Sequence, residues 1–275
     1  MRPLEQQSIL VTGATAGLGK ALASELARRG ATVLVHGRSQ ERVDAAIEQI
    51  AAASGSERLV AHVADLSSLA AVRRLAEAVS ATGDGLDALV NNAGVAIPER
   101  RETEHGYELT FAVNYLAPYL LTRLLLPRLR QTPSARIVNV ASIGQAPVRF
   151  DDVMQERGYD MAFAYSQSKL ALVSFTFELA ERLKAEGEAR ISVTALHPAT
   201  LMPTKLVVET MGRTVDSLEE GVDATLRLVI DPELDGVSGV YFDHFNEAAA
   251  DPEASDPRAR RRLWELSERL CGLER

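Results

Sequence analysis

Residues 8–20 read SILVTGATAGLGK, an apolar run that leads directly into a turn with three glycines. The apolar run predicts a β-strand, and the spacing of apolar residues after the turn predicts a helix. Gly13, Gly17 and Gly19 let the backbone approach a phosphate, and a helix that begins near Gly17 offers unpaired amide groups there. This unit favours a dinucleotide as its ligand, although glycines also mark ordinary strand-to-helix turns.

Similar short apolar runs recur along the chain, and helical apolar spacing follows most of them. This alternation predicts a parallel sheet with helices on both faces. The predicted strands are residues 8–12, 32–37, 58–64, 86–91, 135–141, 190–197 and 237–242. The predicted helices are residues 18–30, 40–54, 68–82, 104–130 and 160–187. We expect one α/β domain over residues 1–275, with a doubly wound (Rossmann), seven-stranded, mostly parallel sheet at about 7–245 and a C-terminal helix at about 257–271.

The composition, 46% hydrophobic and 25% charged residues, is that of an ordinary globular protein. The net charge of −8 argues against nucleic acid as a partner. The basic run at 257–262 is expected to be the exposed face of the last helix. Pro118, Arg123 and Pro127 interrupt the longest apolar run, so no transmembrane segment is expected.

Cysteine and histidine are sparse in this chain. Cys271 is the only cysteine, which excludes an intrachain disulfide and favours a reducing, cytoplasmic setting. The five histidines show no spacing typical of a metal site, so no metal is expected.

The second strand ends in VLVHGRS, and the residues there bear on the kind of dinucleotide. A site for NAD usually has Asp or Glu at this place to accept from the ribose 2′-hydroxyl. Gly37 and Arg38 remove that acid and add a cation, and Thr15 in the glycine turn adds a hydroxyl. Arg38 can bind a 2′-phosphate with two hydrogen bonds, so NADP(H) is favoured over NAD(H). The alternative is an ordinary surface arginine, one of 26 in the chain.

Two more strand ends carry polar residues. In HVADLSS, Asp65 can accept from the adenine amino group, although Asp65 or Ser67 acting as a helix cap explains the pattern equally well. In LVNNAGVA, the two asparagines can bridge neighbouring loops while the Ala-Gly pair leaves room for a cofactor. Loop stabilisation alone would also explain the asparagines.

The segment AFAYSQSKLALVSF places Tyr165 four residues before Lys169, so in a helix both side chains lie on one face. A free phenol has a pKa near 10 and is a poor base at neutral pH. A positive charge about 5 Å away, at an effective dielectric of ~20, stabilises the phenolate by roughly 3 kcal/mol, or about two pKa units. The pattern therefore predicts that Lys169 lowers the pKa of Tyr165, although the spacing alone does not exclude coincidence.

The chain resembles the short-chain dehydrogenase/reductase family over roughly residues 7–245, in the ordered set TGATAGLG, ADL, NNAG, Asn114, Ser142 and Tyr165-SQS-Lys169. Three further segments look like the branch that contains retinol-dehydrogenase-like and protochlorophyllide-reductase-like enzymes: FAVNYLAPYLLT, GYDMAFAYSQSKLALVSFTFELAERL and RRLWELSERLCGL. The resemblance implies a catalytic tetrad of Asn114, Ser142, Tyr165 and Lys169.

Each member of the implied tetrad has a chemical role. Tyr165 exchanges a proton with a substrate oxygen, and Ser142 donates a hydrogen bond to that oxygen. Lys169 also donates to the nicotinamide ribose hydroxyls. Asn114 interrupts a predicted helix, where a kink can hold a water that relays protons to Lys169, although an exposed asparagine would look identical.

The residues expected to contact the cofactor come from the same motifs. They are Gly13, Thr15, Gly17, Leu18, Gly19, Arg38, Asp65, Leu66, Asn92, Ala93, Gly94, Tyr165, Lys169 and Pro198. One family feature is altered: the family has a Pro-Gly pair with a Thr five residues after the Pro, and this chain reads HPATLMPTK. Ala199 replaces the glycine and Thr204 is displaced by one, so Thr204 is given no role.

Two segments are expected to form the walls of a substrate pocket: residues 144–161 and 199–215. Their apolar residues favour a hydrophobic small molecule, and they are Phe150, Met154, Leu201, Met202 and Leu206. The alternative is that these side chains pack their loops onto the sheet.

The leading hypothesis is an oxidoreductase that moves a hydride between NADP(H) and an alcohol or carbonyl carbon, with Tyr165 as general acid/base. Reduction of a carbon–carbon double bond in an enone is one alternative. A non-catalytic NADP(H)-binding sensor or interaction protein is another, against which the intact tetrad argues. Residues 160–187 allow a homo-oligomer, as the resemblance suggests.

Overall fold

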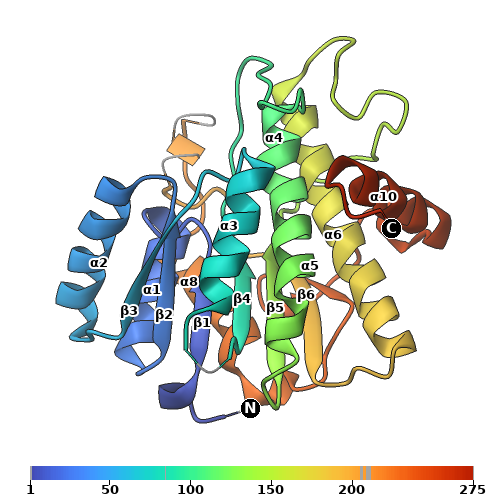
Figure 1. Cartoon of the computed structure of the whole chain (residues 1–275). Coiled ribbons are helices and arrows are strands. Elements are labelled where there is room, and N and C mark those ends of the chain that lie inside the picture. The colour runs from blue at the N-terminus through green and yellow to red at the C-terminus, as the bar shows by residue number, and fades with distance from the viewer. Residues whose placement is uncertain (1, 84, 205–206, 209–211, 275) are drawn as a thin grey trace.

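The computed structural model describes residues 2–83, 85–204, 207–208 and 212–274, and the described residues form one sheet of eight strands (Figure 1). The strand order is β3-β2-β1-β4-β5-β6-β7-β8, and the neighbours are parallel except for the β7–β8 pair. The bounds are β1 Ser8–Val11, β2 Thr32–Gly37, β3 Leu59–Val63, β4 Ala88–Asn91, β5 Ala135–Val140, β6 Ile191–His197, β7 Val240–Asp243 and β8 Asn246–Glu247. The predicted strands are confirmed with small shifts at their ends, and β8 is additional.

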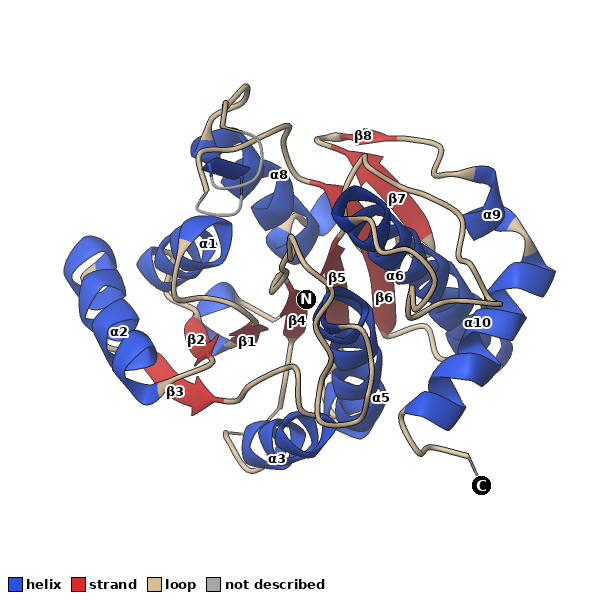
Figure 2. Cartoon of the chain, turned by 90° about the horizontal axis from the view of Figure 1, so that it is seen from above, coloured by secondary structure: helices blue, strands red, loops and turns tan. Residues whose placement is uncertain are grey.

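Helices cover both faces of the sheet, as Figure 2 shows from above. One face carries α1, α2 and α8, the other carries α3, α5 and α6, and apolar side chains form a core under each set. The bounds are α1 Gly17–Arg28, α2 Gln40–Ser54, α3 Leu69–Ser80, α5 Ala117–Leu129, α6 Met161–Ala185 and α8 Leu218–Ile230. Shorter helices are η1 Leu4–Gln6, η3 Pro232–Leu234 and α9 Pro252–Ser255. The predicted doubly wound α/β fold is therefore confirmed.

Two helices differ from the prediction. The segment predicted over 104–130 becomes helical only at α4 Leu109–Phe111, because the Glu108 carboxylate caps the first turn. It then passes through a π-helix, η2 Ala112–Leu116, into α5. The helix α8 lies outside the predicted set, although Ser217 and Glu220 form the capping box that marks its start.

The described helix Leu109–Leu129 is long and apolar enough to cross a membrane by length and composition. Of its most apolar window, 83% is buried inside the protein, as in the core helix of a globular protein. Its surface therefore packs against the rest of this chain.

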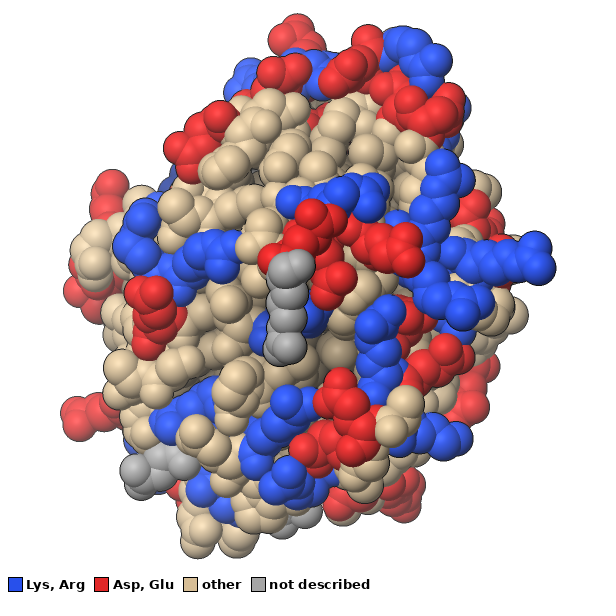
Figure 3. Space-filling view, turned by 45° about the vertical axis from the view of Figure 1, so that its right-hand side comes forward, with Lys and Arg blue, Asp and Glu red and all other residues tan. Residues whose placement is uncertain are grey.

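The C-terminal helix α10, Pro257–Leu270, packs along α6 (Figure 1). Trp264 anchors it, since the guanidinium groups of Arg182 and Arg123 lie 4.0 and 4.5 Å from the Trp264 ring. The basic run at 257–262 is only partly an exposed face, because Arg260 is buried and its Nη2 lies 2.6 Å from a carboxylate oxygen of Glu181. Figure 3 shows acidic and basic side chains interspersed on this side of the molecule.

Candidate active site

The glycine turn packs against the loop after β4, at the point where the winding of the sheet reverses. Gly13 has φ +66°, and a Cβ added there would lie 2.9 Å from the Ala93 Cα. A Cβ at Gly19 would lie 2.4 Å from Asn92 Nδ2. Thr12 Oγ1 accepts from the amides of Asn92 and Ala93 at 2.9 and 3.1 Å, and Asn92 Nδ2 donates to the Thr12 carbonyl at 2.8 Å. The two loops are thus locked together, as the predicted bridging by asparagine requires.

No side chain caps the start of α1. Ala16 is the N-cap residue of α1 and offers no side-chain hydrogen bond to the first amides, while Leu18 packs into the core. The start of α2 is similar, because its N-cap residue Ser39 makes no side-chain cap. Arg38 is exposed beside it, and Thr15 lies against Gly37 at the end of β2. Two helix starts with uncapped amides and a nearby cation fit the phosphates of a dinucleotide.

His36 on β2 contacts the glycine turn, and the sequence patterns do not reveal this contact. Its Nδ1 accepts from the Gly13 amide at 3.2 Å, and its Nε2 lies 3.1 Å from the Ala64 carbonyl oxygen. Burial lowers the pKa of His36 to about 4, so the ring is neutral and carries its proton on Nε2. The histidine therefore joins the glycine turn to the end of β3.

In the loop after β3, neither Asp65 nor Ser67 caps the following helix, contrary to one interpretation of the sequence. Asp65 is exposed, and its Oδ1 accepts from the Ser67 amide at 2.9 Å, while Leu66 is buried. Ser68 caps α3 by accepting from Ala71, so the helix-cap reading of Asp65 or Ser67 is wrong. The exposed carboxylate remains accessible to a ligand.

Asn91, at the end of β4, makes hydrogen bonds to buried side chains of neighbouring elements. Asn91 is buried, and its Nδ2 donates to Asn139 at 2.8 Å and to Thr122 at 3.1 Å. Asn139 in turn donates to Thr176 on α6 at 2.8 Å. These bonds tie β4 and β5 to α5 and α6 beneath the candidate active site.

The side chains of Ser142, Tyr165 and Lys169 come together at the carboxyl end of β5. Ser142 follows the strand by two residues, and Tyr165 and Lys169 lie on the facing turn of α6. Lys169 Nζ lies 5.5 Å from the centroid of the Tyr165 ring and donates to the Val140 carbonyl at 2.8 Å. The side chain of Ser142 interacts with the Tyr165 hydroxyl.

The pKa of Tyr165 differs in direction from the expectation. Burial raises it above its ordinary value, and the hydrogen bond with Ser142 opposes this rise only in part. Burial also lowers the pKa of Lys169 to about 8. The predicted lowering of the Tyr165 pKa is therefore wrong for the chain by itself, because desolvation outweighs the effect of Ser142.

Asn114 lies in the π-helix η2, which is the break in the helix that its position predicts. It is fully buried rather than exposed. Its Oδ1 accepts from the Val95 amide at 2.8 Å, and its Nδ2 donates to the Val95 carbonyl at 2.9 Å and to Ser168 Oγ at 3.0 Å. A Cβ added at Gly94 would lie 3.5 Å from Lys169 Nζ. Asn114 thus holds the NNAG loop beside Lys169.

The segment after β6 brings Pro198, which is buried, to the same end of the sheet. Thr204 has an unexpected place: its Cγ2 would lie 3.2 Å from a Cβ added at Gly17, so this segment borders the glycine turn. Of the predicted pocket residues, Phe150, Met154 and Met202 pack against the cores, which is the alternative considered for them. Leu201 has φ +48° and is half-buried, and Leu206 lies outside the described residues.

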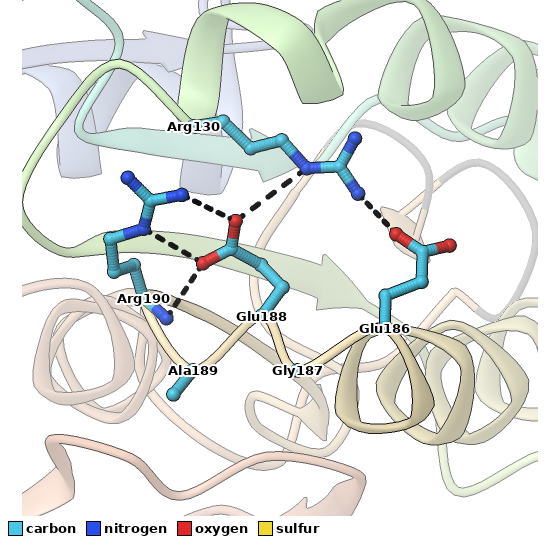
Figure 4. Close-up of a pocket in the computed structure, with 6 residues that line it drawn as sticks. All are labelled: Arg130, Glu186, Gly187, Glu188, Ala189 and Arg190. Atoms are coloured by element: carbon cyan, nitrogen blue, oxygen red, sulfur yellow. Dashed lines mark hydrogen bonds and ion pairs between the residues drawn. The ribbon is translucent and has the colours of Figure 1, made fainter.

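Two cavities lie at opposite ends of the sheet. One of about 370 Å³ lies at the amino ends of β5 and β6 and is lined by Arg130 and residues 186–190 (Figure 4). Its arginines and glutamates pair with one another, so it carries no unpaired charge for a ligand. The other, of about 270 Å³, includes Ile143, Gln145 and Tyr241, and the Tyr241 hydroxyl donates to the Ser142 carbonyl at 3.0 Å. The second cavity adjoins Ser142 and is therefore the one that lies beside the candidate active site.

Comparison with known proteins decides the family. The sequence pattern of the short chain dehydrogenase family matches residues 7–212. The chain belongs to this family. The short-chain dehydrogenase is 38% identical over 285 residues to retinol dehydrogenase 13 of Homo sapiens, covering 98% of this chain and 85% of the relative. It is 36% identical over 294 residues to retinol dehydrogenase 14 of Homo sapiens, covering 97% and 87%.

Solved structures agree with this assignment. A protein of Mycobacterium paratuberculosis described as uncharacterised superposes with a TM-score of 0.80 at 31% identity, covering 97% of this chain and 94% of the other. A short chain dehydrogenase of Pseudomonas syringae gives a TM-score of 0.71 at 26% identity, covering 88% and 96%. The short-chain dehydrogenase is thus retinol-dehydrogenase-like, an oxidoreductase that acts on alcohol or carbonyl groups.

Proposed function

We propose that this short-chain dehydrogenase transfers a hydride between NADP(H) and an apolar alcohol or carbonyl compound, with Tyr165 as the general acid/base. The observation that carries the proposal is the meeting of Ser142, Tyr165 and Lys169 at the carboxyl end of β5. A protonatable hydroxyl beside a cation serves proton transfer, whereas a site that only binds a nucleotide has no need of it.

The chain's own residues divide the work of reducing a carbonyl. A bound nicotinamide supplies the hydride. Tyr165 donates its proton to the substrate oxygen, and its raised pKa keeps the phenol protonated for this at neutral pH. Ser142 holds the same oxygen by a hydrogen bond. Lys169 is mostly charged below about pH 8 and stabilises the phenolate that remains.

The preference for NADP(H) rests on the end of β2. Arg38 is exposed there, Gly37 carries no acid, and the start of α2 has no side-chain cap. A 2′-phosphate placed at these groups would meet a guanidinium and uncapped backbone amides. The same groups give the 2′-hydroxyl of NAD(H) no carboxylate acceptor, so the phosphorylated cofactor fits better.

The apolar substrate class rests on the relatives, which are retinol dehydrogenases by name. Retinaldehyde and long aliphatic aldehydes are therefore the first probes to use. The experiment is to follow NADPH oxidation with a panel of aldehydes, ketones and enones. We expect turnover of apolar aldehydes. Turnover of enones alone would favour carbon–carbon reduction, and NADPH binding without any turnover would favour a sensor.

A further inference from the structure

The segment after β6 is closed by backbone bonds between its start and its end. The Val215 amide donates to the Leu201 carbonyl at 3.1 Å, and the Asp216 amide donates to the Thr200 carbonyl at 2.9 Å. The Thr200 amide in turn donates to the Asp216 carboxylate. We call these four residues the exit clamp. The clamp holds the residues that follow β6 beside the residues that precede α8.

His244, in the turn between β7 and β8, fastens the exit clamp to the sheet. Its Nε2 lies 2.9 Å from Asp216 Oδ2, and its Nδ1 lies 2.8 Å from Asp243 Oδ1. Its amide donates to the His197 carbonyl at 2.8 Å, and its φ is +54°. Because both ring nitrogens face carboxylates, only the imidazolium form donates to both.

The surroundings of His244 favour that charged form. Partial burial lowers the pKa of His244. The hydrogen bonds with Asp216 and Asp243 together raise this pKa by more than burial lowers it, so the net shift is upward. The His197 ring lies 5.3 Å away, and its burial, opposed in part by nearby carboxylates, lowers its pKa to about 4, so it stays neutral.

The same cluster has the composition of a metal site. Ligand atoms of His197, Asp243 and His244 lie within 4.8 Å of one another. Both nitrogens of His244 already face carboxylates, however, so a proton on each nitrogen satisfies the group without a metal. The experiment must therefore distinguish a clamp held by hydrogen bonds from a clamp held by a metal ion.

The exit clamp has a consequence for the proposed cofactor site. Thr204, a few residues beyond Thr200, borders Gly17 in the glycine turn. We propose that Asp216 and His244 are positioning residues that fix the described segment Thr200–Thr204 against the glycine turn. The effect on cofactor binding rests on the proposed function, whereas the clamp itself does not.

Two kinds of variant test the clamp. Asp216→Asn and His244→Phe weaken or remove the charged hydrogen bond between these two side chains. Asp223→Asn and His105→Gln are controls, because both are exposed side chains outside the clamp. The first measurement is cleavage after the exposed Arg213 by an arginine-specific protease, normalised to an unfolded peptide with the same bond.

At pH 6 we expect cleavage after Arg213 to be about tenfold faster in Asp216→Asn and His244→Phe, the ordinary effect of losing a charged hydrogen bond. The controls should match the wild type. Unchanged cleavage in both disrupting variants would overturn the proposal, and so would opening of the wild type by EDTA at pH 6, since a metal would then hold the clamp.

The second measurement is the dissociation constant of NADPH, followed by fluorescence without turnover. We expect about tenfold weaker binding in the two disrupting variants, with a smaller change in kcat. If cleavage responds as expected but no NADPH binds to any variant, the clamp stands and the proposed function fails. If NADPH binds equally to all variants while cleavage differs, the clamp does not position the proposed cofactor site and that part of the proposal is overturned.

Discussion

Lys169 Nζ lies 5.5 Å from the centroid of the Tyr165 ring, yet burial keeps the pKa of the phenol above its ordinary value. The pair is therefore arranged as a protonated acid with a cation ready to stabilise its conjugate base. This arrangement suits reduction of a carbonyl directly, and oxidation requires further help in removing the phenolic proton.

Tyr165→Phe should reduce turnover by about 10² to 10⁴-fold, the usual range for a lost general acid, while NADPH affinity stays nearly unchanged. The ring that packs in the site is retained. Tyr107→Phe is the control, because the Tyr107 hydroxyl donates to the Leu270 carbonyl, near the C-terminus. Steady-state rates and NADPH fluorescence give both quantities. Full activity in Tyr165→Phe would remove this residue from the mechanism.

Lys169→Met should abolish most turnover and change how stability depends on pH. The pKa of Lys169 is about 8 in the folded chain and 10.5 ordinarily, so its buried charge destabilises the fold below pH 8. This cost fades as the pH rises toward the unfolded value. We expect the wild type to gain about 2 kcal/mol relative to Lys169→Met between pH 7 and 9.5, measured by urea unfolding.

Lys184→Met is the control for that experiment, since Lys184 lies on the same helix and is exposed. Its stability should follow the wild type at both pH values. A parallel pH dependence in wild type and Lys169→Met would show that the ammonium is not held in a desolvated place.

Arg38→Asp should weaken NADPH binding by at least about tenfold while NADH binding changes little or improves. The reason is that the variant replaces a cation with an anion where the 2′-phosphate is placed. Arg58→Asp makes the same change of charge at an exposed residue beside the amino end of β3, and it should leave both affinities unchanged. Equal losses for the two cofactors in Arg38→Asp would refute the assignment of NADP(H).

Gly13→Ala should weaken both the fold and the cofactor site. A Cβ at Gly13 would meet the Ala93 backbone at 2.9 Å, whereas Gly55 has a similar φ of +71° with nothing within 4 Å. Gly55→Ala is therefore a control for backbone strain alone, and we expect it to cost about 1 kcal/mol. Gly13→Ala should reduce the free energy of unfolding by at least about twice that amount, because the backbone at Ala93 must move. Loss of NADPH binding only in Gly13→Ala would complete the test.

The sequence was sufficient for elements with strong local signals. The seven long strands, the helix over Gln40–Ser54 and the Tyr165–Lys169 spacing follow from apolar periodicity and helical geometry. Asn114 marks the π-helix because asparagine is a poor helix former inside an apolar run. The strand β8 is two residues long and has too short a pattern to detect.

The rest depends on contacts between distant parts of the chain. His36 reaches the glycine turn across the sheet, and His197 meets His244 from 47 positions away, so no local spacing reveals either contact. The direction of the Tyr165 pKa depends on burial, which the spacing of Tyr165 and Lys169 does not contain. A cytoplasmic location and a homo-oligomer stay predictions.

The cover of α6 has a consequence for the synthesis of the protein. Residues 167–176 of α6 are buried on every side, and part of their cover is α10, which begins at Pro257. During translation this apolar helix leaves the ribosome well before the segment that shields it. The nascent chain therefore exposes an apolar surface until α10 emerges. A premature stop before Pro257 would leave that surface permanently exposed.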